Sequence, residues 1–249
     1  MSDRHDSPVQ MPVFEYAACT ATLRRRILGN NPLFSDLQEG DIKEVNRRFS
    51  SQSFDQGETV IRAGQRAERF YILATGAAKL IQPQESGRMV LHDILSTGDY
   101  FGAIFGFGYG PGEYGETVIT DSPMCSISID SRAFRSILTD YPKVALRAVD
   151  AFSNRLSLAY EMLGRLGSSS VESRIAFVLL RLAAKLGRPW EGKTLIHAPL
   201  TREDIASMAA TSTESCSRVM SDLRKRGLID AGRRWVAIVD PPGLEELLS

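Results

Sequence analysis

A strict seven-residue apolar repeat in the middle of the chain constrains the fold most. Apolar residues recur there at alternating intervals of four and three positions, at Ala145, Val149, Phe152, Leu156, Ala159, Leu163 and Leu166. A helix with this spacing carries a narrow apolar stripe that packs against a second helix, as in a coiled coil. A helix buried inside one domain usually has a wider stripe, with a third apolar position per heptad. The repeat therefore predicts a long helix that pairs with its copy in a second subunit.

Turn and capping residues mark both ends of this helix. Pro142 follows Asp140 and Tyr141 at a favourable first helical position, and Gly167 with the serines after it ends the helix. Ser169 and Glu172 have capping-box spacing for a further helix. Because 249 residues suffice for two domains, we expect an N-terminal extension at 1–32, a sensor domain at 33–140, the dimerisation helix at 141–167 and a C-terminal domain at 168–249.

The part of the chain before the helix has the pattern of a β domain. Glycines at positions such as 57, 64, 76 and 98 separate short apolar runs. Turn signals spaced about every 8 to 12 residues are typical of a β-sandwich or β-roll. The predicted strands include 59–61, 69–74, 77–82, 89–94 and 124–129.

The C-terminal part of the chain predicts two short helices joined by a tight turn. Thr201 stands three residues before Asp204 as an N-cap, and Ser212 caps the second helix. Apolar residues share one face of that second helix, at Cys216, Val219, Met220 and Leu223. Two short strands, around 228–230 and 235–239, then flank a basic turn, as in a winged helix-turn-helix.

This geometry places the first turns of the second helix where they enter the DNA major groove. An arginine there can donate two hydrogen bonds to guanine, and a glutamate can accept one from the cytosine amino group. The predicted base-reading residues are Thr213, Glu214, Ser217 and Arg218. Fixed positive charge suits phosphate contact, although a solvated helix face would carry it equally well. The phosphate candidates are Arg202, Lys225, Arg226, Arg233 and Arg234.

In this order of segments, with the glycine pattern of the β domain and the GDYFG run at 98–102, the chain resembles the Crp–Fnr superfamily over about residues 33–240. The resemblance implies an α+β fold: a cyclic-nucleotide-binding-type β-roll, a dimerisation helix and a winged helix-turn-helix. It implies a cytoplasmic homodimer that regulates transcription, with double-stranded DNA and RNA polymerase as partners. The run 214–218 resembles the E-x-x-S-R pattern of the fumarate-nitrate reduction and nitrogen-fixation regulators, which implies a TTGAT-like half-site in an inverted repeat.

The chain departs from the members of this family that bind cyclic AMP. Those members follow the G-D-x-x-G run with a glutamate for the ribose, and an Arg-Ser pair holds the phosphate. Here Ala103 follows the run, Tyr-Gly-Glu-Thr at 114–117 replaces the Arg-Ser pair, and no arginine lies between positions 88 and 132. A buried phosphate without a guanidinium partner, near Glu113 and Glu116, would be repelled. We therefore expect activity that does not depend on cyclic AMP and is constitutive, or tuned by redox state or an unknown ligand.

The cysteines give little support for a cofactor. The chain has three, Cys19, Cys125 and Cys216, without a C-x-x-C pair, which favours reduced thiols over a disulfide framework or a metal site. Cys125 resembles the roll cysteine of the iron–sulfur branch, but one N-terminal cysteine cannot complete four ligands. We expect no cofactor, while a cyclic-nucleotide-responsive regulator, or one binding haem through His92, remains the alternative. Cys216 is either an inert buried thiol or a redox-active one.

Several other classes of protein are disfavoured by the sequence. No apolar stretch approaches the roughly 18 residues of a membrane span, and the N-terminus lacks the pattern of a secretory signal. No nucleophile elbow, phosphate-binding glycine loop or cluster of metal ligands is present in the sequence, so we expect no enzyme.

Overall fold

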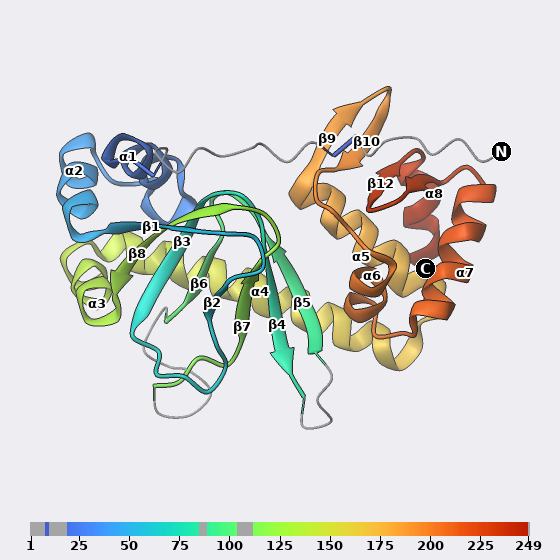
Figure 1. Cartoon of the computed structure of the whole chain (residues 1–249), viewed down its shortest axis with the longest axis horizontal. Coiled ribbons are helices and arrows are strands. Elements are labelled where there is room, and N and C mark those ends of the chain that lie inside the picture. The colour runs from blue at the N-terminus through green and yellow to red at the C-terminus, as the bar shows by residue number, and fades with distance from the viewer. Residues whose placement is uncertain (1–7, 10–18, 85–88, 104–111, 249) are drawn as a thin grey trace. The chain divides into compact units, whose positions relative to one another are not determined.

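The computed structural model describes residues 8–9, 19–84, 89–103 and 112–248 (Figure 1). The chain divides into two compact units, and the boundary falls after Leu156, within helix α4 (Pro142–Ser168). Of the described residues, one unit contains those from 19 to 156, and the other contains 157–248 together with 8–9. In the described part of the chain, no helix is both long enough and apolar enough to cross a membrane.

The N-terminal unit is built on two antiparallel sheets, with strand orders β1-β8-β3-β6 and β2-β7-β4-β5. The strands are β1 (Ser50–Phe54), β2 (Thr59–Ile61), β3 (Arg69–Thr75), β4 (Ala78–Pro83), β5 (Met89–Leu95), β6 (Tyr100–Gly102), β7 (Thr117–Thr120) and β8 (Met124–Asp130). All five predicted strands are present, which confirms the β domain. The sequence analysis missed the polar strand β1 and the short strands β6 and β7.

Aromatic side chains fill the space between the two sheets. The rings of Tyr71 and Phe101 stack with their centroids 5.0 Å apart, and both side chains are buried. Gly102 has a φ of +88°, and a Cβ at this position would lie 2.6 Å from the Arg69 carbonyl oxygen. The second glycine of the GDYFG run is therefore required by the close approach of β6 to β3.

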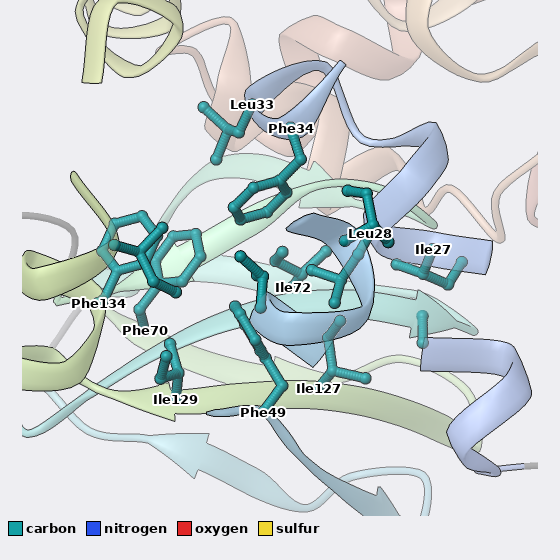
Figure 2. Close-up of a cluster of buried hydrophobic side chains, with 14 of the residues drawn as sticks. Ile27, Leu28, Leu33, Phe34, Phe49, Phe70, Ile72, Ile127, Ile129 and Phe134 are labelled. Atoms are coloured by element: carbon teal, nitrogen blue, oxygen red, sulfur yellow. The ribbon is translucent and has the colours of Figure 1, made fainter. Parts of the chain in front are cut away.

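A helical cap covers the other face of the β1-β8-β3-β6 sheet. It consists of α1 (Ala21–Asn30), η2 (Pro32–Phe34), α2 (Glu39–Arg48), α3 (Ser131–Asp140) and the first turns of α4. Figure 2 shows the buried cluster beneath the cap, in which Phe70 of β3 and Phe134 of α3 stack with centroids 4.1 Å apart. Leu28 of α1 is fully buried in the same cluster. Helix α1 thus contributes to the core of this unit.

One prediction about the cysteines was wrong. We expected reduced thiols, but the structure joins Cys19 to Cys125 of β8 in a disulfide, with Cα atoms 6.0 Å apart. The two residues are 106 positions apart in sequence. Their pairing depends on how α1 lies over the sheet, and no spacing rule contains that information. Cys216 is a free, buried thiol.

The C-terminal unit is a helical domain with a four-stranded antiparallel sheet of order β11-β12-β10-β9 (Figure 1). Its elements are α5 (Val171–Leu186), β9 (Gly187–Trp190), β10 (Lys193–Ile196), α6 (Arg202–Met208), α7 (Thr213–Lys225), β11 (Ile229–Gly232), β12 (Trp235–Ile238), α8 (Pro241–Glu245) and η3 (Glu246–Leu248). Both predicted wing strands are present, at β11 and β12. The segment around Pro189 forms a hairpin of β9 and β10.

The helix α5 also begins differently from the prediction. Ser170, and not Ser169, is its N-cap, and the Ser170 hydroxyl accepts a hydrogen bond from the Ser173 backbone N–H at 3.1 Å. Either serine can satisfy a free N–H at a helix start. Helix α4 extends through Ser168, so the cap falls one residue later than the spacing suggested.

Candidate nucleic-acid interface

The first helix of the candidate interface, α6, begins with a reciprocal cap. The Thr201 hydroxyl accepts from the Asp204 backbone N–H at 3.1 Å, and the Asp204 carboxylate accepts from the Thr201 N–H at 2.9 Å. These two bonds satisfy donors that the helix itself leaves unpaired. The cap that the sequence predicted is therefore the one that starts α6.

An arginine of α5 holds the turn after α6. The Nε atom of Arg174 donates to the Ala209 carbonyl oxygen at 2.9 Å, and its Nη1 donates to the Ser169 carbonyl at 3.0 Å. Ala210, which follows Ala209 in the turn, has a φ of +48°, which is unusual for a residue with a Cβ. Arg174 thus joins the start of α5 to the turn, a role that no local sequence signal indicates.

Helix α7 presents a buried face and an exposed face. Cys216, Met220 and Leu223 are fully buried beneath it, as its apolar spacing predicts. Ser212 caps the helix by accepting from the Ser215 N–H at 3.1 Å. The sheet and the other helices of this unit therefore support α7 along its apolar side.

The predicted base-reading residues lie together on the opposite side of α7. Thr213, Glu214 and Arg218 are exposed, and Ser217 is partly exposed. Arg218 Nη1 lies 3.9 Å from Glu214 Oε1, and Arg218 Nη2 donates to the Ser215 hydroxyl at 3.3 Å. A shallow open hollow on this side is lined by Glu214, Ser217, Arg218, Ser221, Asp222 and Lys225.

The predicted phosphate-contacting residues are placed in different ways. Arg233 and Arg234 lie exposed in the turn between β11 and β12, and Lys225 is exposed in the last turn of α7. Arg226 instead bonds to Glu172 of α5 and, at 3.2 Å, to Asp222 of α7. These hydrogen bonds raise the pKa of the Arg226 guanidinium, and the bond to Glu172 has the larger effect. Arg226 thus has two carboxylate partners within the protein.

Arg202 at the start of α6 and Cys216 of α7 interact electrostatically. Burial lowers the pKa of the Arg202 guanidinium, which is only partly exposed. Burial raises the pKa of the Cys216 thiol to about 11, against the smaller opposing effect of the Arg202 charge. The reactive form of cysteine is the thiolate, so this environment favours the inert interpretation of Cys216.

Tyr114 and Glu116 lie in the segment where the resemblance implies an Arg-Ser pair for a cyclic phosphate. The Tyr114 ring is buried, and its hydroxyl donates to the Arg69 carbonyl oxygen at 3.2 Å. Glu116 lies nearby on the surface, 3.8 Å from the Nδ1 atom of His92 in β5. Within the described ranges, no three His, Cys, Asp or Glu side chains are grouped as a metal site.

The apolar stripe of heptad residues on α4, called the seam below, is largely exposed to solvent in the single chain. Val149, Leu156 and Leu163 are each more than half exposed, and Leu166 is 42% exposed. Ala145 and Phe152 are partly buried, and Ala159 is exposed. The first turns of α4 bury a different stripe, that of Val144 and Ala148, in the N-terminal core. Phe152 also packs against that core, so the exposed part of the stripe is formed by Val149, Leu156, Leu163 and Leu166.

Comparisons with known proteins place this architecture. A Crp-like helix-turn-helix domain matches residues 173–247, and a cyclic nucleotide-binding domain matches residues 51–141. The transcriptional activator protein FnrL of Cereibacter sphaeroides is 30% identical over 198 residues, which cover 76% of each chain. The chain belongs to the Crp–Fnr superfamily.

Other relatives agree with this assignment. A CRP-like cAMP-activated global transcriptional regulator of Mycobacterium tuberculosis is 28% identical over 214 residues, covering 86% of this chain and 95% of that protein. The structure of FixK2 from Bradyrhizobium japonicum superposes with a TM-score of 0.70 at 21% identity, covering 81% of this chain and 98% of that one. The predicted fold class is confirmed. The protein is a transcription regulator of this superfamily with a DNA-binding helix-turn-helix, formed by α6 and α7.

Proposed function

We propose that this regulator acts in the cytoplasm as a homodimer and binds an inverted repeat of TTGAT-like half-sites. We further propose that it needs neither cyclic AMP nor a bound cofactor. The observation that carries the proposal is the exposed group of Thr213, Glu214, Ser217 and Arg218 at the start of α7. These residues supply both hydrogen-bond donors and acceptors on a rigidly supported helix.

The charged pair on α7 is suited to an exchange of partners on DNA. Glu214 and Arg218 lie one helical turn apart, with 82% and 72% of their side chains exposed. An ion pair this exposed contributes less than about 1 kcal/mol. A bidentate contact of arginine with guanine supplies roughly 1–3 kcal/mol of discrimination against other bases. Separating the pair therefore costs less than the base contacts return.

The bare seam of α4 supports the proposed homodimer. Three of its large apolar side chains, Val149, Leu156 and Leu163, are more than half exposed in the single chain. Each square ångström of such surface removed from water contributes about 25 cal/mol. A two-fold pairing of α4 buries the seam against its own copy, and a two-fold dimer reads an inverted repeat.

The packing of the β-roll supports independence from cyclic AMP. Tyr114 fills space beside Arg69 and Gly102, and the Glu116 carboxylate would repel a phosphate. The Mycobacterium tuberculosis relative is called cAMP-activated, which keeps a nucleotide-responsive regulator as the second candidate. Titration calorimetry of the full chain with cyclic AMP distinguishes the two. Binding at micromolar or tighter affinity would establish the second candidate.

The relatives' names also suggest how the bound protein acts. FnrL is called a transcriptional activator, so we propose activation through contact with RNA polymerase. The decisive experiment for the DNA site is selection of bound sequences from random duplex DNA by the full chain, with and without cyclic AMP. We expect an inverted repeat with half-sites about one helical turn apart, unchanged by the nucleotide. Enrichment of no sequence, or of unpaired half-sites alone, would contradict the proposal.

A further inference from the structure

The disulfide between Cys19 and Cys125 joins an accessible sulfur to a buried one. Cys19 is partly exposed and directly precedes Thr20, the N-cap of α1. Cys125 is 6% exposed within β8, where it pairs with Ser53 of β1. An attacking thiol from solvent therefore reaches only one of the two sulfurs, that of Cys19.

We propose that Cys19 and Cys125 form a reversible thiol–disulfide site that clamps α1 onto the β-roll when oxidised. A dithiol reductant opens it: one thiolate attacks Cys19 Sγ, forms a mixed disulfide and releases the Cys125 sulfur, which takes up a proton. The second thiol of the reductant then displaces Cys19, leaving two protein thiols and an oxidised reductant. A disulfide oxidant such as oxidised glutathione reverses both steps.

The protein accommodates the reduced form of both cysteines. Cys19 Sγ lies 3.8 Å from the Gln52 carbonyl oxygen, which can accept a hydrogen bond from a free thiol at that position. The buried Cys125 packs within the apolar cluster under the helical cap, where a thiol behaves as a small apolar group. Opening the bond thus leaves no uncompensated charge in the core.

The clamp reaches α4 through the helical cap. Leu23, Ile27 and Leu28 of α1 share one buried cluster with Val144 and Ala148 of α4. Just after the η2 turn, Asp36 also accepts a hydrogen bond from the Arg147 guanidinium of α4 at 2.8 Å. Fixing α1 therefore restrains the packing around the first turns of α4. Any consequence of this restraint for dimerisation through α4 rests on the proposed function, whereas the redox site itself does not.

Counting free thiols in redox buffers tests the site. The full chain is equilibrated with mixtures of reduced and oxidised glutathione, quenched, and labelled with a thiol-reactive polymer that shifts its mobility on a denaturing gel. We expect wild type to pass from three free thiols to one, within a single chain, as the buffer becomes oxidising. Cys216→Ser is the matched control and should pass from two to none, whereas Cys19→Ser and Cys125→Ser should show no transition.

Three outcomes would overturn the site. They are a disulfide that survives excess reduced glutathione, free thiols throughout, or a bond between two chains. Hydrogen exchange then tests the clamp: amides of α1 should exchange at least several-fold more slowly in oxidised than in reduced wild type, and equally in both buffers for Cys19→Ser. Equal exchange in oxidised and reduced wild type would overturn the clamp. Neither measurement requires DNA binding, so a result that overturns the redox site or the clamp is distinct from one that overturns the proposed function.

Discussion

Single side chains at the start of α7 are expected to divide specificity from affinity. Arg218 is exposed beside Glu214 and can reach a guanine edge, so Arg218→Ala should cost about 1–3 kcal/mol at one base pair of each half-site. The loss should disappear on DNA in which that base pair is already replaced. Competition binding with a set of singly substituted sites measures it.

The matched control for Arg218 is Arg233, which lies in the turn of the wing. A phosphate contact carries no base information, so Arg233→Ala should weaken binding to all sequences alike. Because a homodimer loses one such contact in each chain, it should also reduce the slope of log affinity against log salt concentration by about two units. Equal loss of base preference in the two variants, or none in Arg218→Ala, would mean that other residues read the bases.

The buried thiol of Cys216 makes a prediction about alkaline pH. Its pKa rises from 9.0 unfolded to about 11 folded, so the folded state holds the proton more tightly. The contribution of the protonated thiol to the free energy of unfolding is fully present below about pH 9. It is lost as the pH rises to about 11, by up to roughly 2–3 kcal/mol. Urea unfolding of wild type and Cys216→Ala at pH 7 and pH 10.5 should show the smaller pH dependence in the variant. The same pH dependence in both would show that the thiol is not responsible.

The elements predicted correctly from the sequence are those with local signals. Thr201 with Asp204 and Ser212 cap α6 and α7, and the turn of the wing is marked by glycine and arginine. Strand β1, with the sequence SSQSF, has one buried side chain, Phe54, and is held by pairing with β8. Such an element depends on its partner strand, which lies about 75 residues later, and local pattern does not reveal it.

The candidate site shows the same limit. Spacing along α7 predicted its exposed polar group, because one helix defines which residues share a face. The ion pair between Arg226 and Glu172 and the hydrogen bonds of Arg174 to the turn after α6 each join different elements. The sequence analysis did not find them. Sequence reasoning therefore located the exposed polar face of α7 but not the contacts that fix the helix in place.

The disulfide makes a prediction about the stability of the helical cap. A bond that closes a loop of 106 residues restricts the unfolded chain, and removing a native disulfide typically costs about 2–5 kcal/mol. Reduction should lower the free energy of unfolding of wild type by a similar amount and leave that of Cys19→Ser unchanged. Urea unfolding with and without a dithiol measures the difference. Cys216→Ser should respond to reduction as wild type does, because the Cys216 thiol of the wild-type chain takes no part in the disulfide.

At the scale of the whole molecule, the proposed function makes specificity depend on the pairing of two chains. One helix-turn-helix reads a single half-site, and the two halves of a palindrome require two α7 helices related by a two-fold axis. The bare heptad seam of α4 supplies a surface for that pairing. We therefore expect loss of the dimer to abolish recognition of the palindrome, although the seam and the proposed base-reading residues lie on different elements.

A charge introduced into the seam tests this dependence. Leu163 is a heptad residue that is 59% exposed in the single chain, so Leu163→Glu costs the monomer little. In the dimer it buries a carboxylate against apolar side chains of the other copy, which is strongly unfavourable. Leu158→Glu is the matched control, because Leu158 is also exposed on α4 but lies off the seam.

Light scattering and binding to the selected palindrome should separate these two variants. We expect Leu163→Glu to have the 27.5 kDa mass of one chain at concentrations where wild type and Leu158→Glu have twice that mass. Its affinity for the palindrome should fall to that for a single half-site, while Leu158→Glu retains the affinity of wild type. A Leu163→Glu protein that stays dimeric and binds normally would place the subunit contact elsewhere. Dissociation of both variants would show that the contact is broader than the heptad stripe.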